Sequence, residues 1–157
     1  MKKKLFLSLL IIVSLFIIIG CDSKKNESNN QNNNQIENTI NESNEVISSV
    51  KVVINNKEYI LNLEDNETAR SFIDLLPQEY SMNELNGNEK YIYLDSSLPT
   101  NSSNLKHINS GDVMLYGNNC LVIFYKSFDT NYSYTKIGHI DNLDNLGNES
   151  IKAKFEK

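Results

Sequence analysis

The chain has 157 residues, a formal net charge of −5 at pH 7, no tryptophan and two cysteines. Removal of Lys2, Lys3 and Lys4 with a leader peptide would bring the charge to −8, which disfavours nucleic acid and anionic lipid surfaces as partners.

The N-terminus has the pattern of a secretory leader. Three lysines precede the uncharged apolar run LFLSLLIIVSLFIII, residues 5–19, which Gly20 and Cys21 follow. An apolar run of about fifteen residues is short for a stable membrane span, which needs roughly 20. Residues 1–20 are therefore predicted to be a signal peptide. The alternative is an uncleaved anchor with a chance cysteine.

The sequence IIGC resembles the bacterial lipobox. Ile18 and Gly20 fit the motif, and Ile19 is bulkier than the Ala or Ser commonly found there. The resemblance implies that Cys21 is lipidated and becomes the mature N-terminus. We therefore expect a lipoprotein anchored to the extracytoplasmic face of the cell membrane in a Gram-positive bacterium, with the membrane as a partner through this lipid.

Residues 22–45, DSKKNESNNQNNNQIENTINESNE, contain nine asparagines and almost no apolar side chains. Such a segment cannot bury enough apolar surface to fold. We predict a flexible tether over residues 21–45, lipidated cysteine included, with a span of roughly 25–30 Å. Residues 46–157 are expected to form one domain of ordinary size.

The domain begins with strand patterns. Residues 50–54 and 59–63 alternate in hydropathy and flank Asn55-Asn56, which predicts a tight hairpin. Asp65-Asn66 then offers a helix N-cap. Apolar residues recur from Ala69 to Leu76 at helical spacing before Pro77, which predicts one amphipathic helix over residues 67–76.

The rest of the domain reads as strands. The segment Gly117-Asn118-Asn119 predicts a second hairpin between two of them. Several short strands with one helix favour a mainly β fold, a small closed barrel, because closure removes the sheet edges. The predicted strands are residues 91–94, 113–116, 120–125, 134–140 and 151–155.

Three segments carry a family resemblance: EDNETARSFIDLLP at 64–77, MNELNGNEKYIYLDSSLPTN at 82–101, and GDVMLYGNNCLVIFYKSFDTNYSYTKIGHID at 111–141. Together they resemble the small bacterial cyclophilin-like proteins, which are compact β-barrels related in fold to peptidyl-prolyl isomerases. The resemblance implies a cyclophilin-like barrel with one main helix. It implies the fold rather than an activity.

The residues that cyclophilins use for isomerisation are not recognisable here. Cyclophilins present an Arg from a barrel strand, beside Phe, Gln, Trp and His. The single arginine of this chain, Arg70, lies on the predicted helix four residues before Asp74, where an ion pair between the two is expected. No catalytic residue is therefore assigned. A divergent isomerase or other enzyme remains the alternative to a binding domain.

Cys120 lies in the apolar run CLVIFY. With Cys21 lipidated it has no partner within the chain, so it is either a small buried residue or a functional thiol. No neighbouring cation in the sequence would stabilise a thiolate, which favours a core strand.

No metal or cofactor site is predicted. His107 is expected in a loop and His139 on a strand, at a surface or hydrogen-bonded position, with no ligand pattern around either. Asp141, Asp144 and Glu149 lack the spacing of an EF-hand loop, so a solvated loop is expected there.

Tyrosines and phenylalanines are frequent in the central strands and in the loop SFDTNYSYT. Tyrosine combines an apolar ring with a polar tip, which suits both barrel packing and recognition surfaces. The recognition alternative predicts a shallow pocket for a small molecule or a peptide segment. Its candidate ligand-binding residues are Tyr91, Tyr93, Tyr116, Phe128 and Tyr134.

Overall fold

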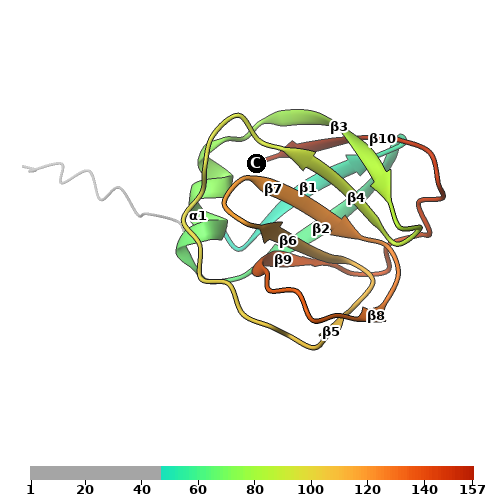
Figure 1. Ribbon diagram of the computed structural model, residues 1–157. Coiled ribbons are helices and arrows are strands. Elements are labelled where there is room, and N and C mark those ends of the chain that lie inside the picture. Colours follow the sequence, from blue (N-terminus) through green and yellow to red (C-terminus); the bar gives the residue numbers. More distant parts are fainter. Residues whose placement is uncertain (1–46) are drawn as a thin grey trace, which may run out of the picture. The chain divides into compact units, whose positions relative to one another are not determined.

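Eight antiparallel strands close into a barrel in the order β1-β10-β3-β4-β7-β6-β9-β2 (Figure 1). The computed structural model describes residues 47–157; the predicted signal peptide, Cys21 and the tether lie outside these residues. The barrel strands are β1 Ser49–Ile54, β2 Lys57–Leu63, β3 Gln78–Leu85, β4 Glu89–Tyr93, β6 Asp112–Tyr116, β7 Cys120–Phe124, β9 Thr135–Ile140 and β10 Ile151–Glu156. The predicted mainly β fold, a closed barrel with one main helix, is confirmed.

The first hairpin forms where the sequence predicted it. Asn55 and Asn56 have φ angles of 49° and 65°, and Ile54 pairs with Lys57 across the turn. Two consecutive positive φ angles match the twist of the flanking strands, and asparagine adopts them more readily than most residues.

Strand β3 is absent from the sequence-based prediction, yet it joins β10 to β4 and completes the barrel. Its sequence QEYSMNEL is mostly polar, and Met82 is its one fully buried residue. Its apolar alternation is too weak to stand out, so pairing with its neighbours decides its conformation. A turn with positive φ at Asn86 and Gly87 leads into β4, which begins two residues earlier than predicted.

Helix α1, Glu67–Asp74, packs its apolar face against one end of the barrel (Figure 1). The Asn66 side chain accepts a hydrogen bond from the Ala69 amide at 2.8 Å, which confirms the predicted N-cap. Phe72 is fully buried, and its ring centroid lies 5.3 Å from that of Phe155 in β10. The helix ends two residues before the predicted Leu76.

The predicted ion pair between Arg70 and Asp74 is wrong. Arg70 instead bonds Asp65, with 2.6 Å between Nη1 and Oδ1. Helical side chains lean toward the N-terminus of their helix, so the guanidinium reaches back past the N-cap.

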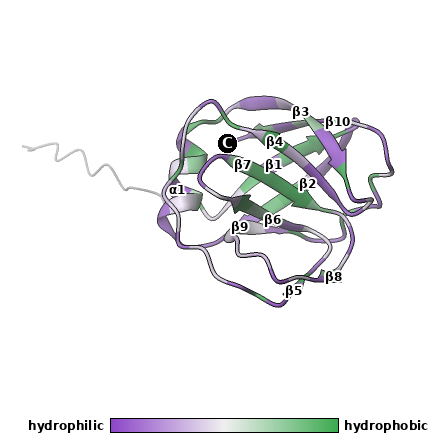
Figure 2. Ribbon diagram, in the orientation of Figure 1, coloured by the Kyte–Doolittle hydropathy of each residue, from purple (hydrophilic) through white to green (hydrophobic). Residues whose placement is uncertain are grey.

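Two hydrophobic clusters lie on opposite sides of β7. Leu121 and Ile123 face the barrel interior, whereas Cys120, Val122 and Phe124 face outward into the second cluster. Segments that include the short strands β5, His107–Ile108, and β8, Phe128–Asp129, cover this outer face. Figure 2 shows hydrophobic residues concentrated on β6 and β7, whereas β3 and most of the connections are hydrophilic. Within residues 47–157, no helix is long and apolar enough to cross a membrane.

Candidate functional site

The outer face of β4 forms one wall of a cavity. Every second side chain of this strand points outward, namely those of Glu89, Tyr91 and Tyr93. The side chains of Lys90 and Ile92 point to the opposite face. This follows from the period-two geometry of a strand, which places every second side chain on the same face. One carboxylate and two tyrosines thus stand in a row on the barrel surface.

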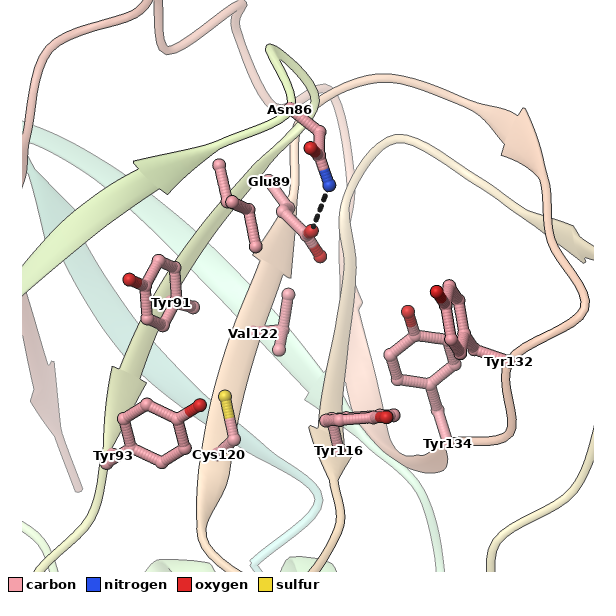
Figure 3. Close-up of a pocket in the computed structure, with 10 residues that line it drawn as sticks. Asn86, Glu89, Tyr91, Tyr93, Tyr116, Cys120, Val122, Tyr132 and Tyr134 are labelled. Atoms are coloured by element: carbon pink, nitrogen blue, oxygen red, sulfur yellow. Dashed lines mark hydrogen bonds between the residues drawn. The ribbon is translucent and has the colours of Figure 1, made fainter.

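Strand β7 supplies the floor, and the end of β6 together with the segment before β9 supplies the far wall (Figure 3). Cys120 and Val122 point up from the floor between the two walls. The cavity has a volume of about 280 Å³, near the lower end of the roughly 300–1,000 Å³ typical of small-molecule sites. Its lining residues are Leu85, Asn86, Glu89, Tyr91, Tyr93, Tyr116, Cys120, Val122, Tyr132 and Tyr134.

The five tyrosines of the lining stand in two groups. The ring centroids of Tyr91 and Tyr93 are 6.0 Å apart, and that of Tyr116 lies 6.0 Å from Tyr132 and 5.5 Å from Tyr134. At the rim, Tyr93 and Tyr132 are each 63% exposed and Tyr116 is 45% exposed. Exposed aromatic rings gathered around one hollow are typical of a recognition surface rather than of barrel packing.

Four of the five predicted ligand-binding residues therefore lie around one cavity: Tyr91, Tyr93, Tyr116 and Tyr134. Phe128 does not line it. Its ring packs behind the cavity, with its centroid 5.4 Å from that of Phe124. Phe124 in turn stands at a right angle to Tyr134, at 5.4 Å. Phe128 thus supports a wall of the cavity from the second hydrophobic cluster.

Glu89 is the residue that sequence reasoning missed. The residue is 8% exposed, and its side chain accepts one long hydrogen bond, from Asn86 Nδ2 at 3.4 Å (Figure 3). Burial raises the pKa of its carboxyl, the Asn86 bond lowers it, and the nearby charge of Glu84 raises it further. The sequence does carry a signal, because Glu89, Tyr91 and Tyr93 have strand spacing. The predicted strand began too late to include it.

Cys120 is a buried free cysteine at the start of β7, which confirms its prediction as a residue of a core strand. Its sulfur lies at the cavity floor, so the outer face of the strand is not sealed at this point. Burial and the charge of Glu89 raise the pKa of the thiol. A thiol held protonated in this way is a poor nucleophile at neutral pH.

Tyr134 is 6% exposed and joins the cavity wall to the cluster behind it. Burial, followed by the charge of Glu89, raises the pKa of its hydroxyl to about 12. The hydroxyl therefore stays neutral under physiological conditions and adds no charge to the cavity.

The histidines and the acidic loop lie outside the cavity. His107 is in β5 and not in the predicted loop, because pairing of Ile108 with Phe128 extends the backbone there; its Nδ1 is 2.6 Å from Asp129. His139 sits on β9 with its Nδ1 3.0 Å from Asp112, which confirms a hydrogen-bonded strand position.

In the acidic loop, Asp144 accepts hydrogen bonds from Lys57 and Tyr59 while its side chain stays 57% exposed, so the predicted solvated loop is confirmed there. Across residues 47–157, no three His, Cys, Asp or Glu side chains gather where they could hold a metal ion.

The barrel coincides with the match to a known family. The model of the cyclophilin-like family matches residues 52–156, from β1 to the end of β10. The chain belongs to the cyclophilin-like family. Comparison with curated proteins and with solved structures gave no match.

In this cyclophilin-like protein the one arginine, Arg70, lies on α1 and is not among the residues that line the cavity. The lining also lacks histidine and lysine. The chemistry on offer at the cavity is that of tyrosine rings, a protonated thiol and a single carboxylate.

Proposed function

We propose that the protein is a lipid-anchored binding module, held by Cys21 on the extracytoplasmic face of the membrane, whose tyrosine-lined cavity captures a small molecule or a side chain of a peptide. The observation that carries the proposal is the gathering of five tyrosines around one cavity on the outer face of the barrel, with three of them exposed at its rim.

A binding role without catalysis is supported by the groups that line the cavity. Cys120 has a raised thiol pKa, and no positively charged side chain stands beside it. Arg70, the group an isomerase would need on a strand, is on the surface of α1 and paired with Asp65. A divergent isomerase is the alternative, and the experiment below tests it in parallel.

The chain offers an internal reporter for ligand binding. It has eight tyrosines and no tryptophan, so tyrosine fluorescence is not masked, and five of the eight line the cavity. We expect a fragment library screened by tyrosine fluorescence and by ligand-observed NMR to yield saturable binders. Their binding should be lost in Tyr93→Ala and Tyr116→Ala. It should be retained in Ile60→Ala, which removes a 53% exposed apolar side chain on β2, outside the cavity.

Absence of any binder sensitive to the two tyrosine variants would refute the binding role. Proline-peptide isomerisation that is lost in the same two variants would instead support the enzyme alternative. Anchoring is tested separately: Cys21→Ala should abolish incorporation of a labelled fatty acid, because a thiol is the acceptor. A Cys21→Ala protein that still carries the label would contradict the lipobox interpretation.

A further inference from the structure

Taking the proposed binding role of the cavity as its basis, we propose that the ligand carries an alkylammonium group, whose cationic head lies between the Glu89 carboxylate and the faces of the surrounding tyrosine rings. The inference names the chemistry of the ligand, and it depends on the charge and the ring arrangement of the cavity.

The cavity lining contains one carboxylate and no basic side chain. Among its ten lining residues Glu89 is the single carboxylate, and none is lysine, arginine or histidine. Charged side chains are almost never buried without a partner, because leaving water is costly for them. Glu89 is nine-tenths buried with only the long bond from Asn86, so its counterion is missing from the lining.

The carboxylate is open to the cavity. In residues 47–157, the one buried side-chain oxygen or nitrogen without a hydrogen-bond partner is Asn88 Oδ1. Glu89 Oε1 accepts the bond from Asn86, whereas Oε2 has no partner among these residues and is not among the buried atoms, so Oε2 is accessible. Figure 3 shows the carboxylate pointing into the space between the two groups of tyrosines. An ammonium group entering this space could donate to it directly.

The one buried lysine or arginine of residues 47–157, Lys90, already has hydrogen-bond partners elsewhere. Lys90 follows Glu89 in β4, but its side chain turns to the other face of the sheet. Its Nζ donates to the carbonyl oxygens of Gly147 at 2.6 Å and Glu149 at 2.8 Å. Lys90 therefore does not neutralise Glu89, and the place of a counterion stays open for a ligand.

Tyrosine rings complete the recognition of a cation. The negative face of an aromatic ring attracts an ammonium group within about 6 Å of its centroid, and cages of such rings bind quaternary ammonium ions. The protein uses the same contact internally: Lys90 Nζ lies 4.8 Å from the centroid of Tyr125, and Lys57 Nζ lies 5.1 Å from that of Tyr59. The cavity presents five rings and no cation of its own.

The volume limits the size of the group that enters. About 280 Å³ accommodates a small amine or the end of a lysine side chain, but not a folded segment. The shared chemistry is the alkylammonium head. It can come from a free amine or from a peptide, and the two sources are separated by the probes chosen below.

Binding is expected to depend on pH through Glu89. The ionisable groups around it are Glu84, which raises its pKa, and Tyr125, Cys120 and Tyr134, whose own pKa values its charge raises. The last three are neutral near pH 7, and each has a raised pKa, so they do not titrate as the pH falls. Protonation of Glu89 removes the charge that attracts the ligand, so affinity for a cation should fall as the pH is lowered through its raised pKa.

The test compares charged probes with uncharged probes of the same shape. Choline is paired with dimethylbutanol and n-butylammonium with n-butanol, each titrated into the full chain in a non-ionic detergent and followed by tyrosine fluorescence. We expect each cation to bind at least tenfold more tightly than its uncharged partner. Glu89→Gln should remove this tenfold preference while changing affinity for the alcohols less than twofold. Glu79→Gln, a half-exposed carboxylate on β3 outside the cavity lining, should leave it intact.

Two results would overturn the inference and leave the proposed binding role standing: equal affinity for the cations and the alcohols, or a preference that survives in Glu89→Gln. If the protein bound none of these probes and no library fragment, the result would contradict the proposed binding role itself. A fifth titration, with Nα-acetyl-lysine methylamide, which keeps the ε-ammonium group, distinguishes a peptide from a free amine as the source of the ammonium group. Tighter binding of this compound than of n-butylammonium supports the ammonium group of a peptide, and the reverse supports a free amine.

Discussion

The substitution Glu89→Gln should stabilise the protein at neutral pH while it impairs ligand binding. Glu89 is 8% exposed, and its carboxylate has only a 3.4 Å hydrogen bond from Asn86, which the amide oxygen of glutamine can still accept. Leaving a buried polar group poorly bonded costs about 1–3 kcal/mol and more when the group is charged, so the uncharged amide of glutamine is less costly to bury than the carboxylate. We expect Glu89→Gln to raise the free energy of unfolding at pH 7.5 by about 1 kcal/mol, the low end of this range, because the glutamine amide is itself incompletely bonded.

The gain has a defined pH dependence. Burial raises the pKa of Glu89 in the folded protein above its ordinary value of 4.5, so the folded state binds this proton more tightly than the unfolded chain does. The wild type therefore loses stability relative to Glu89→Gln as the pH rises from the ordinary pKa through the raised one. Below the ordinary pKa the carboxyl is neutral in both states, and the difference between the two proteins should vanish.

Urea unfolding at pH 7.5 and at pH 3.5 to 4 measures this difference. It uses protein that starts at residue 21 with a Cys21→Ser substitution, so that no lipid is attached. With an m-value of roughly 1–3 kcal/mol/M, a gain of about 1 kcal/mol moves the midpoint by about 0.3–1 M. Glu79→Gln, on the surface of β3, should change stability by no more than about 0.5 kcal/mol at either pH. The reasoning would be refuted if Glu89→Gln were less stable than the wild type at pH 7.5, or if its stability gain over the wild type were the same at both pH values.

Two further predictions concern single residues. In a Cys21→Ala background, Cys120 should react slowly with a thiol reagent in the folded protein and quickly in urea, and fast labelling of the folded protein would contradict its burial. Cys120→Ala should lower the free energy of unfolding by about 1 kcal/mol because a small buried group is removed. Asn66→Ala should lose about 1 kcal/mol in urea unfolding because the Ala69 amide loses its cap. Asp65→Ala, which removes only the exposed pair with Arg70, should lose less, and an equal loss would argue against the cap.

Burial of both faces of β7 could be predicted from the sequence. The run CLVIF is apolar at every position, which indicated burial on both faces, and both faces are buried. The turns at Asn55-Asn56 and the cap at Asn66 were also predictable, because they depend on neighbouring residues alone. The closed barrel followed from the number of short strands and from the family resemblance.

The missed features share a physical cause. Strand β3 has too few apolar residues for its hydropathy pattern to predict a strand. It forms because β10 and β4 provide hydrogen-bond partners on its two sides. The short β5 likewise depends on its partner β8, 20 residues further along the chain. Partners this distant in sequence are fixed by closure of the barrel, and local periodicity does not encode them.

The candidate site shows the same division. The sequence by itself singled out the aromatic residues, because tyrosine suits a recognition surface wherever it lies. Only the tertiary structure decided that Tyr91 and Tyr93 of β4 face Tyr116 and Tyr134 across the floor of β7, that Phe128 packs behind them, and that Glu89 is buried at their side. Residue types determine what a side chain can contact, whereas strand register and the covering segments between β4 and β9 determine which side chains meet around one cavity.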